Sequence, residues 1–169
     1  MSAGVAELEA QLATATGPER PRALARLAWY LRRSDPERAI LLAEEATSLT
    51  SDDPTTRAWT QATTALAHRR MGRTQQAEVC AQAAVDSASE AEDADIWAVA
   101  HRTLAGVRAR QGRWADARDL LTQCLESRAG RAAAPMYRAW LLDDLAVAHF
   151  RLGEPEAGRT CAAQSLEAA

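Results

Sequence analysis

The side chains best equipped for chemistry in this 169-residue chain are three histidines, three cysteines and one pair of neighbouring aspartates. The histidines and cysteines are scattered along the chain, at His68, His101, His149, Cys80, Cys124 and Cys161. None belongs to a Cys-x-x-Cys pair or a His-Glu-x-x-His motif, and no Gly-x-Ser-x-Gly or Gly-x-Gly-x-x-Gly pattern occurs. We therefore expect no catalytic residues, no cofactor and no metal ligands, and we do not expect an enzyme.

The aspartate pair, Asp143 and Asp144, does not have the spacing of an acid–base couple. Adjacent residues on a helix project about 100° apart, so the two carboxylates do not converge on one bond. We expect a solvated or groove-lining acidic spot instead. His68 and His149 each follow an alanine by three residues in similar segments, which favours a shared structural role, partly buried between helices.

Residue types that are missing exclude further functions. Without lysine, the chain cannot form a Schiff base or supply the lysine of a phosphate-binding loop. No apolar run approaches the roughly 18 residues of a membrane span, and the N-terminal segment lacks the basic region of a secretory signal. The net charge of −3 argues against nucleic-acid binding. The odd number and wide spacing of the cysteines favour reduced core residues in a cytoplasmic protein.

The elements that hold these side chains are expected to be helices. Forty residues are alanine and 18 are leucine, whereas valine and isoleucine together number only eight. Alanine and leucine favour helices, and strands prefer the β-branched and aromatic residues that are scarce here. The composition therefore predicts an all-α fold.

A repeat is visible within the alanines. Three segments align on Gly72, Gly112 and Gly153, which are 40 and 41 residues apart. Small residues recur seven positions before and five positions after each glycine, at Ala65, Ala105, Ala146, Ala77, Ala117 and Gly158. A weaker, earlier copy has Ser34 in place of the glycine and keeps Ala39, Ala43 and Ala46 in the same register.

Each segment has the pattern of two helices joined at the glycine. Small and apolar residues recur every three or four positions on both sides, which is helical periodicity. The glycine suits a left-handed helix C-cap, and Pro36 and Pro155 suit the first turn of the following helix. The expected elements are a helix at about 2–15 and four hairpins, 19–33 with 36–50, 54–71 with 74–90, 93–111 with 113–128, and 134–152 with 154–168. One hairpin cannot bury its apolar face alone, so we expect the hairpins to stack.

From about residue 19 to residue 168, the chain resembles tetratricopeptide repeats (TPRs). The resemblance rests on Ala65, Gly72, Ala77 and Ala84 and on their counterparts in the other hairpins. The period of 38 to 41 residues is longer than the family's 34, and the family's mid-helix aromatic is replaced by His68, Arg108 and His149. The resemblance implies a right-handed superhelix of about four antiparallel hairpins after an N-terminal helix. It also implies a single domain over 1–169, divided into 1–17, 18–53, 54–92, 93–131 and 132–169.

Charge differs between the two helices of the hairpins. The first helices sum to +8 and the second helices to −7. In the resembling family the first helices line a concave groove, so the resemblance implies a basic groove. The candidate partner-binding residues are Arg32, Arg69, Arg70, Arg102, Arg110 and Arg151. Arginine forks suit carboxylates and phosphates, but these stems could equally cover apolar surface with their guanidinium groups solvated.

The resemblance implies a non-catalytic protein–protein interaction scaffold that binds a protein or an acidic peptide in its groove. The segment LAWYLRRSDPERAILLAEEA is similar to the openings of TPR regions that precede bacterial diguanylate cyclase domains, which implies a regulatory module of a signalling protein. The alternative is a small-molecule or peptide sensor that controls an attached output domain. Near the end of the chain, Ala162 and Leu166 lack a following hairpin, so we expect another domain, a partner or a homodimer through the C-terminal helices there.

Overall fold

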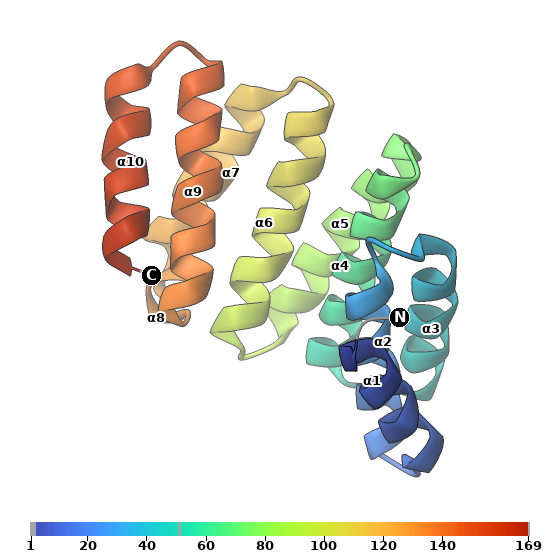
Figure 1. The fold of residues 1–169 in the computed structure, drawn as a ribbon. Helices are drawn as coiled ribbons and strands as arrows, with labels where there is room; N and C mark the ends of the chain where they lie inside the picture. The colour runs from blue at the N-terminus through green and yellow to red at the C-terminus, as the bar shows by residue number, and fades with distance from the viewer. Residues whose placement is uncertain (1–2, 51, 169) are drawn as a thin grey trace. The chain divides into compact units, whose positions relative to one another are not determined.

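The computed structural model describes residues 3–50 and 52–168 (Figure 1). The helices are α1 (Ala3–Thr14), α2 (Glu19–Leu31), α3 (Pro36–Leu49), α4 (Pro54–Arg70), α5 (Thr74–Glu90), α6 (Ala94–Arg110), α7 (Trp114–Glu126), α8 (Arg128–Ala132), α9 (Pro135–Arg151) and α10 (Pro155–Ala168). No strand occurs in these two described stretches. The all-α class and the four hairpins predicted from the sequence are confirmed. The chain divides into two compact units, residues 1–90 and 91–169, called unit 1 and unit 2 below.

Unit 1 contains α1 and the hairpins α2–α3 and α4–α5, and α3 packs against α4. Leu27 and Leu31 of α2 and Ala39 of α3 form a buried cluster with Leu8 of α1. An ion pair of 2.7 Å between Arg38 of α3 and Glu9 of α1 adds to this contact. The N-terminal helix is therefore part of the folded unit and covers the first hairpin.

Unit 2 contains the hairpins α6–α7 and α9–α10, which are joined through the short helix α8. Its core is built by α6, α7 and α9, with Leu121, Cys124, Leu141 and Leu145 among the buried residues. In Figure 1, α9 lies in front of α7, with α6 and α10 on either side of it. This packing buries one face of α9 and leaves the opposite face accessible.

Helix α8 is an addition to the predicted elements, since residues 129–133 lay between two predicted hairpins and were assigned to no helix. The hydroxyl oxygen of Ser127 accepts a hydrogen bond of 2.9 Å from the N–H of Gly130 and so caps the helix. A Cβ at Gly130 would lie 1.9 Å from the carbonyl oxygen of Cys124, so only glycine fits this turn against α7. Gly130 therefore permits a close approach between α7 and α8.

The hairpin turns have the geometry that the aligned glycines predict. Gly72 has a φ of 74°, and Gly112 and Gly153 have values within 5° of it, in the left-handed region that side chains disfavour. In the first of these turns the N–H of Arg73 donates to the carbonyl of His68 at 2.9 Å, and the N–H of Gly72 donates to that of Arg69 at 3.2 Å. This is the Schellman pattern that ends a helix and satisfies its last carbonyls. The prediction of glycine C-caps is confirmed.

The small residues of the repeat lie where two helices meet. Ala65, Ala77, Ala105 and Ala117 are all buried, with at most 2% of their surface exposed. Gly158, the counterpart of Ala77 and Ala117 in the last hairpin, is also buried. Because these side chains are so short, the two backbones of a hairpin can approach closely. The register read from the glycines therefore describes the packing correctly.

Candidate functional site

Four of the six candidate arginines share one position in their hairpins. Arg32, Arg70, Arg110 and Arg151 each stand two residues before the turn glycine, or before Ser34 in the first hairpin. Three of them are the last residues of α4, α6 and α9, and Arg32 directly follows α2. We call this set the arginine ladder. A cation at a helix C-terminus is also favoured by the helix dipole, which helps to explain why arginine is tolerated at each place.

Two ladder arginines are held on tryptophan rings. The guanidinium carbon of Arg32 lies 3.6 Å from the centre of the Trp29 ring, and its Nη1 donates to the Trp29 carbonyl. Trp29 in turn meets Trp59 of α4 edge to face, with 4.8 Å between ring centres. The guanidinium carbon of Arg151 lies 5.5 Å from the centre of the Trp114 ring. Stacking of this kind limits the motion of the side chain before any partner binds.

The ladder members differ in exposure. Arg70, Arg110 and Arg151 are exposed, whereas Arg32 is half-buried. Exposed guanidinium groups keep N–H donors available to a carboxylate from outside. Arg70, Arg110 and Arg151 are therefore the members whose side chains are most accessible from solution.

The two remaining candidates are less accessible. Arg102 of α6 donates from Nε to Oδ2 of Asp144 at 2.7 Å, and its guanidinium carbon lies 5.2 Å from the centre of the Trp140 ring. Asp144 thereby neutralises much of the charge that Arg102 would offer to a partner. Arg69 is half-buried and has contacts of its own. The two neighbouring aspartates therefore differ in their surroundings. Asp144 is paired with Arg102, whereas Asp143 is exposed.

A hollow of about 780 Å³ lies between α7 and α9 in unit 2 and was not anticipated from the sequence. Its lining includes Arg118, Thr122 and Glu126 of α7 and Leu145 and His149 of α9. A second hollow of about 490 Å³ shares Thr122, Glu126 and Leu145 with it and extends to α10. None of the six candidate arginines lines either hollow. Among the residues that line the larger hollow, the sequence analysis had singled out only His149, because of its position in the repeat.

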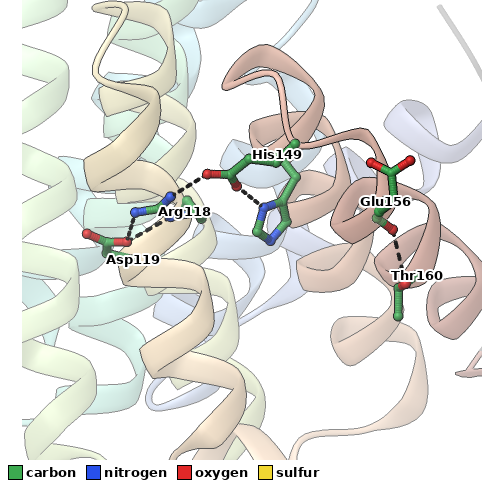
Figure 2. A network of polar contacts seen from close by, with 6 residues as sticks. Arg118, Asp119, His149, Glu156 and Thr160 are labelled. Atoms are coloured by element: carbon green, nitrogen blue, oxygen red, sulfur yellow. Dashed lines mark hydrogen bonds and ion pairs between the residues drawn. The ribbon is translucent and has the colours of Figure 1, made fainter.

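Figure 2 shows the polar network at one edge of the larger hollow. Arg118 pairs with Asp119 at 2.8 Å and with Glu154, in the α9–α10 turn, at 2.9 Å. Nδ1 of His149 lies 2.5 Å from Oε2 of Glu154. The hydrogen bond from His149 and the positive charge of Arg118 hold the pKa of Glu154 below its usual value. The network therefore ties α7 to the turn of the following hairpin.

The histidines at equivalent positions are partly buried, as predicted, but their surroundings differ. The side chain of His149 is 15% exposed and has the Glu154 partner. His68 is half-buried, and its Nδ1 has no hydrogen-bond partner among the described residues. Burial, together with the charge of Arg73, lowers the pKa of His68. Position in the repeat thus decided the burial of each histidine but not its partner.

The described residues contain no group of three or more His, Cys, Asp or Glu side chains that could hold a metal ion. Cys80, Cys124 and Cys161 are free thiols, and burial raises the pKa of each, to about 12 for Cys124. Over the same residues, no helix has both the length and the apolar character needed to cross a membrane.

Comparison with known proteins agrees with the repeat pattern. Residues 56–130 match the family model described as tetratricopeptide repeat. No curated protein sequence matches the chain. The match to the family model therefore covers the second and third hairpins.

Solved structures extend the likeness to nearly the whole chain. A crystal structure of MamA is similar with a TM-score of 0.62 and 17% identity, covering 97% of this chain and 85% of that chain. The nearly identical TPR-like repeats of a putative kinesin light chain from Podosopora anserina give a TM-score of 0.64 and 18% identity, covering 97% of this chain and 83% of that one. At such identities the likeness concerns the fold alone.

Proposed function

Because residues 56–130 match the tetratricopeptide repeat family and nearly the whole chain has a TPR-like fold, we propose that the protein is a non-catalytic binding scaffold. Its partner in this proposal is a protein or peptide with an acidic segment. Tetratricopeptide repeats generally mediate protein–protein interactions. The acidic character of the partner is inferred from the arginines of this chain.

The arginine ladder is the observation that carries the proposal. Arginine is the last residue of the first helix in three hairpins and directly follows that helix in the fourth, although the segments around it differ widely in sequence. A repeated array of guanidinium groups suits a partner that offers carboxylates at several points, and each exposed contact is worth only about 0.2–1 kcal/mol. The ladder therefore predicts binding that requires several arginines together and weakens as salt increases.

We further propose that the scaffold is a cytoplasmic regulatory module of a bacterial signalling protein. The support is the similarity of residues 27–46 to the openings of TPR regions that precede diguanylate cyclase domains. In this proposal any enzymatic activity belongs to an attached domain.

A small-molecule or peptide sensor is the second candidate, and the larger hollow of unit 2 favours it. Its volume of about 780 Å³ lies within the range of roughly 300–1,000 Å³ that is usual for ligand sites. Most of the residues that line it are polar or charged, however, whereas the side chains that line ligand sites are mainly hydrophobic. A metabolite or peptide that raises the melting temperature of the chain, but not that of Thr122→Trp, would favour the sensor over the scaffold.

The test of the scaffold uses a fluorescein-labelled peptide of alternating glutamate and alanine, compared with one of alternating lysine and alanine. We expect the full chain to bind only the acidic peptide, with an affinity that falls between low and high salt. The triple variant Arg70→Glu, Arg110→Glu and Arg151→Glu should weaken binding by about tenfold or more, the combined effect of three exposed contacts.

The matched control is Arg73→Glu, Arg128→Glu and Arg131→Glu, which changes the net charge equally at three exposed arginines outside the ladder. This control should bind the acidic peptide much as the unchanged chain does. Equal binding of both peptides would contradict the proposal, as would a ladder variant that binds no worse than the control.

A further inference from the structure

The accessible face of α9 in unit 2 carries a stripe with the spacing of a coiled-coil interface. Met136, Trp140, Asp143, Val147 and Phe150 follow one another at intervals of four, three, four and three residues. These intervals keep all five on one face of the helix, over about 21 Å at a rise of 1.5 Å per residue. We call these five residues the α9 seam.

Four of the five α9 seam residues are exposed and Trp140 is half-buried, in contrast to the buried residues on the opposite face of the same helix. Met136, Val147 and Phe150 are 49%, 43% and 48% exposed, and all three are large and apolar. On the opposite face, Leu141 and Leu145 are buried in the core of unit 2. An apolar stripe of this length on an otherwise well-packed helix indicates an interaction surface.

Neighbouring side chains hold the seam in place. The Trp140 ring meets Tyr137 edge to face at 5.3 Å and has the Arg102 guanidinium at 5.2 Å. The Phe150 ring lies so close to α10 that a Cβ at Gly158 would come within 2.9 Å of it. Two of the four apolar seam residues are thus ordered anchors, which lose little conformational freedom when a partner binds.

We propose that the α9 seam binds an amphipathic helix of another protein, one with an apolar stripe of the same spacing and a lysine or arginine at its centre. The central residue of the seam is Asp143, which is exposed and makes no hydrogen bond or ion pair with another described residue. Its neighbour Asp144 is already paired with Arg102. A single charge in an apolar helix interface sets register and selects the complementary partner.

A second copy of this chain does not fit the α9 seam. The five seam residues follow a continuous pattern of four-, three-, four- and three-residue intervals, and Asp143 is the third of the five. Parallel in-register pairing of two seams therefore places Asp143 beside Asp143 of the other copy, and antiparallel pairing places each carboxylate against apolar seam residues that offer it no basic partner. Like charges opposed in this way are destabilising, whereas a basic residue there forms an ion pair. The charge at the centre selects a different chain.

This inference goes beyond the acidic partner of the arginine ladder, because it requires an apolar helix with a basic centre. The two can be tested separately, since Asp143 and Val147 are not members of the ladder. Failure of the helix test would leave the acidic-peptide result unchanged.

The probe is a synthetic peptide of three heptads with leucine at the seam positions and lysine at the central one. A companion peptide has glutamate at that position. Binding of each labelled peptide to the full chain is measured by fluorescence anisotropy. We expect the lysine peptide to bind about tenfold more tightly, as expected when an opposite charge replaces a like charge at an interface. Asp143→Arg should reverse this preference.

Val147→Glu should abolish binding of the lysine peptide. The control is Val79→Glu, at a 66% exposed valine of α5 in unit 1, which should bind as the unchanged chain does. Circular dichroism verifies that each variant keeps its helices, and binding of the glutamate–alanine peptide should be unaffected by Val147→Glu. The proposal is overturned if both peptides bind equally or if Asp143→Arg leaves the preference unchanged. It is also overturned if the unchanged chain self-associates and Val147→Glu abolishes that self-association.

Discussion

At the scale of single residues, small side chains decide how closely the helices of each hairpin approach. Ala117 of α7 is 2% exposed and belongs to the same core cluster as Ala105 and Leu121. Two residues earlier on the same helix, Ala115 is exposed. The two alanines share a helix and differ in burial. Comparing the same substitution at both positions therefore distinguishes the effect of packing from the effect of helix propensity.

We expect Ala117→Leu to lower the free energy of unfolding by about 1–3 kcal/mol, because the added atoms have no space between the helices. Ala115→Leu should change it by less than about 0.5 kcal/mol. Thermal unfolding followed by circular dichroism measures both. Equal effects at the two positions would mean that the hairpin register is wrong.

The three thiols should react with a thiol reagent in an order set by burial. Cys124 is buried and its pKa is raised to about 12, so almost none of it is thiolate near neutral pH. Cys80 and Cys161 are half-buried with raised pKa values and should react more slowly than free cysteine but before Cys124. Mass spectrometry after timed labelling identifies each site. Native labelling of Cys124 as fast as in denaturant would contradict the burial described here.

At the scale of the elements, the network around Glu154 connects successive helices of unit 2. Glu154 stands in the α9–α10 turn directly after Gly153, where the left-handed glycine ends α9. From this place its two oxygens reach His149 of α9 and Arg118 of α7. A turn set by local chain geometry thus supplies a contact between hairpins.

This network predicts a pH-dependent contribution to stability. The pKa of Glu154 is lowered in the folded chain, so its contribution is present above the usual value of 4.5 and is lost as pH falls through the folded pKa. Glu154→Gln should therefore lower the melting temperature at about pH 7 and have a smaller effect at a pH well below 4.5.

The control for this effect is Glu156→Gln, at an exposed residue whose ion pair with Arg159 stays within α10. It should change the melting temperature little at either pH, because exposed pairs of this kind contribute little. A Glu154→Gln effect that is the same at both pH values would show that the carboxylate charge is not responsible.

At the scale of the whole molecule, binding through charged residues and association through apolar residues should respond differently to salt. The first helices carry +8 in a chain with a net charge of −3, and binding through them should weaken with salt. Leu166 of α10 is 82% exposed, and contacts through such a side chain are not screened by salt. Salt dependence can therefore distinguish acidic-partner binding from self-association.

We expect the chain to form a homodimer through α10 at high protein concentration, and Leu166→Glu to make it monomeric. Sedimentation velocity at low and high salt measures the association, which salt should not weaken. Leu41→Glu, at a 66% exposed leucine of α3, is the control and should leave the dimer intact. A chain that stays monomeric at every concentration would exclude this contact.

The amino-acid sequence alone determined the helical class, the hairpin boundaries to within about two residues, and the buried small positions, because these depend on local periodicity and on glycine at the turns. The partners of side chains depended on tertiary structure. Sequence proximity made Asp143 and Asp144 look alike, but only packing against α6 pairs Asp144 with Arg102 and leaves Asp143 exposed. Helix α8 and the hollow beside α7 likewise required the structure, since α8 depends on the close approach of Gly130 to Cys124 and the hollow lies between α7 and α9. Periodicity specifies which face of a helix is buried, whereas the neighbour that covers it is decided when the hairpins pack.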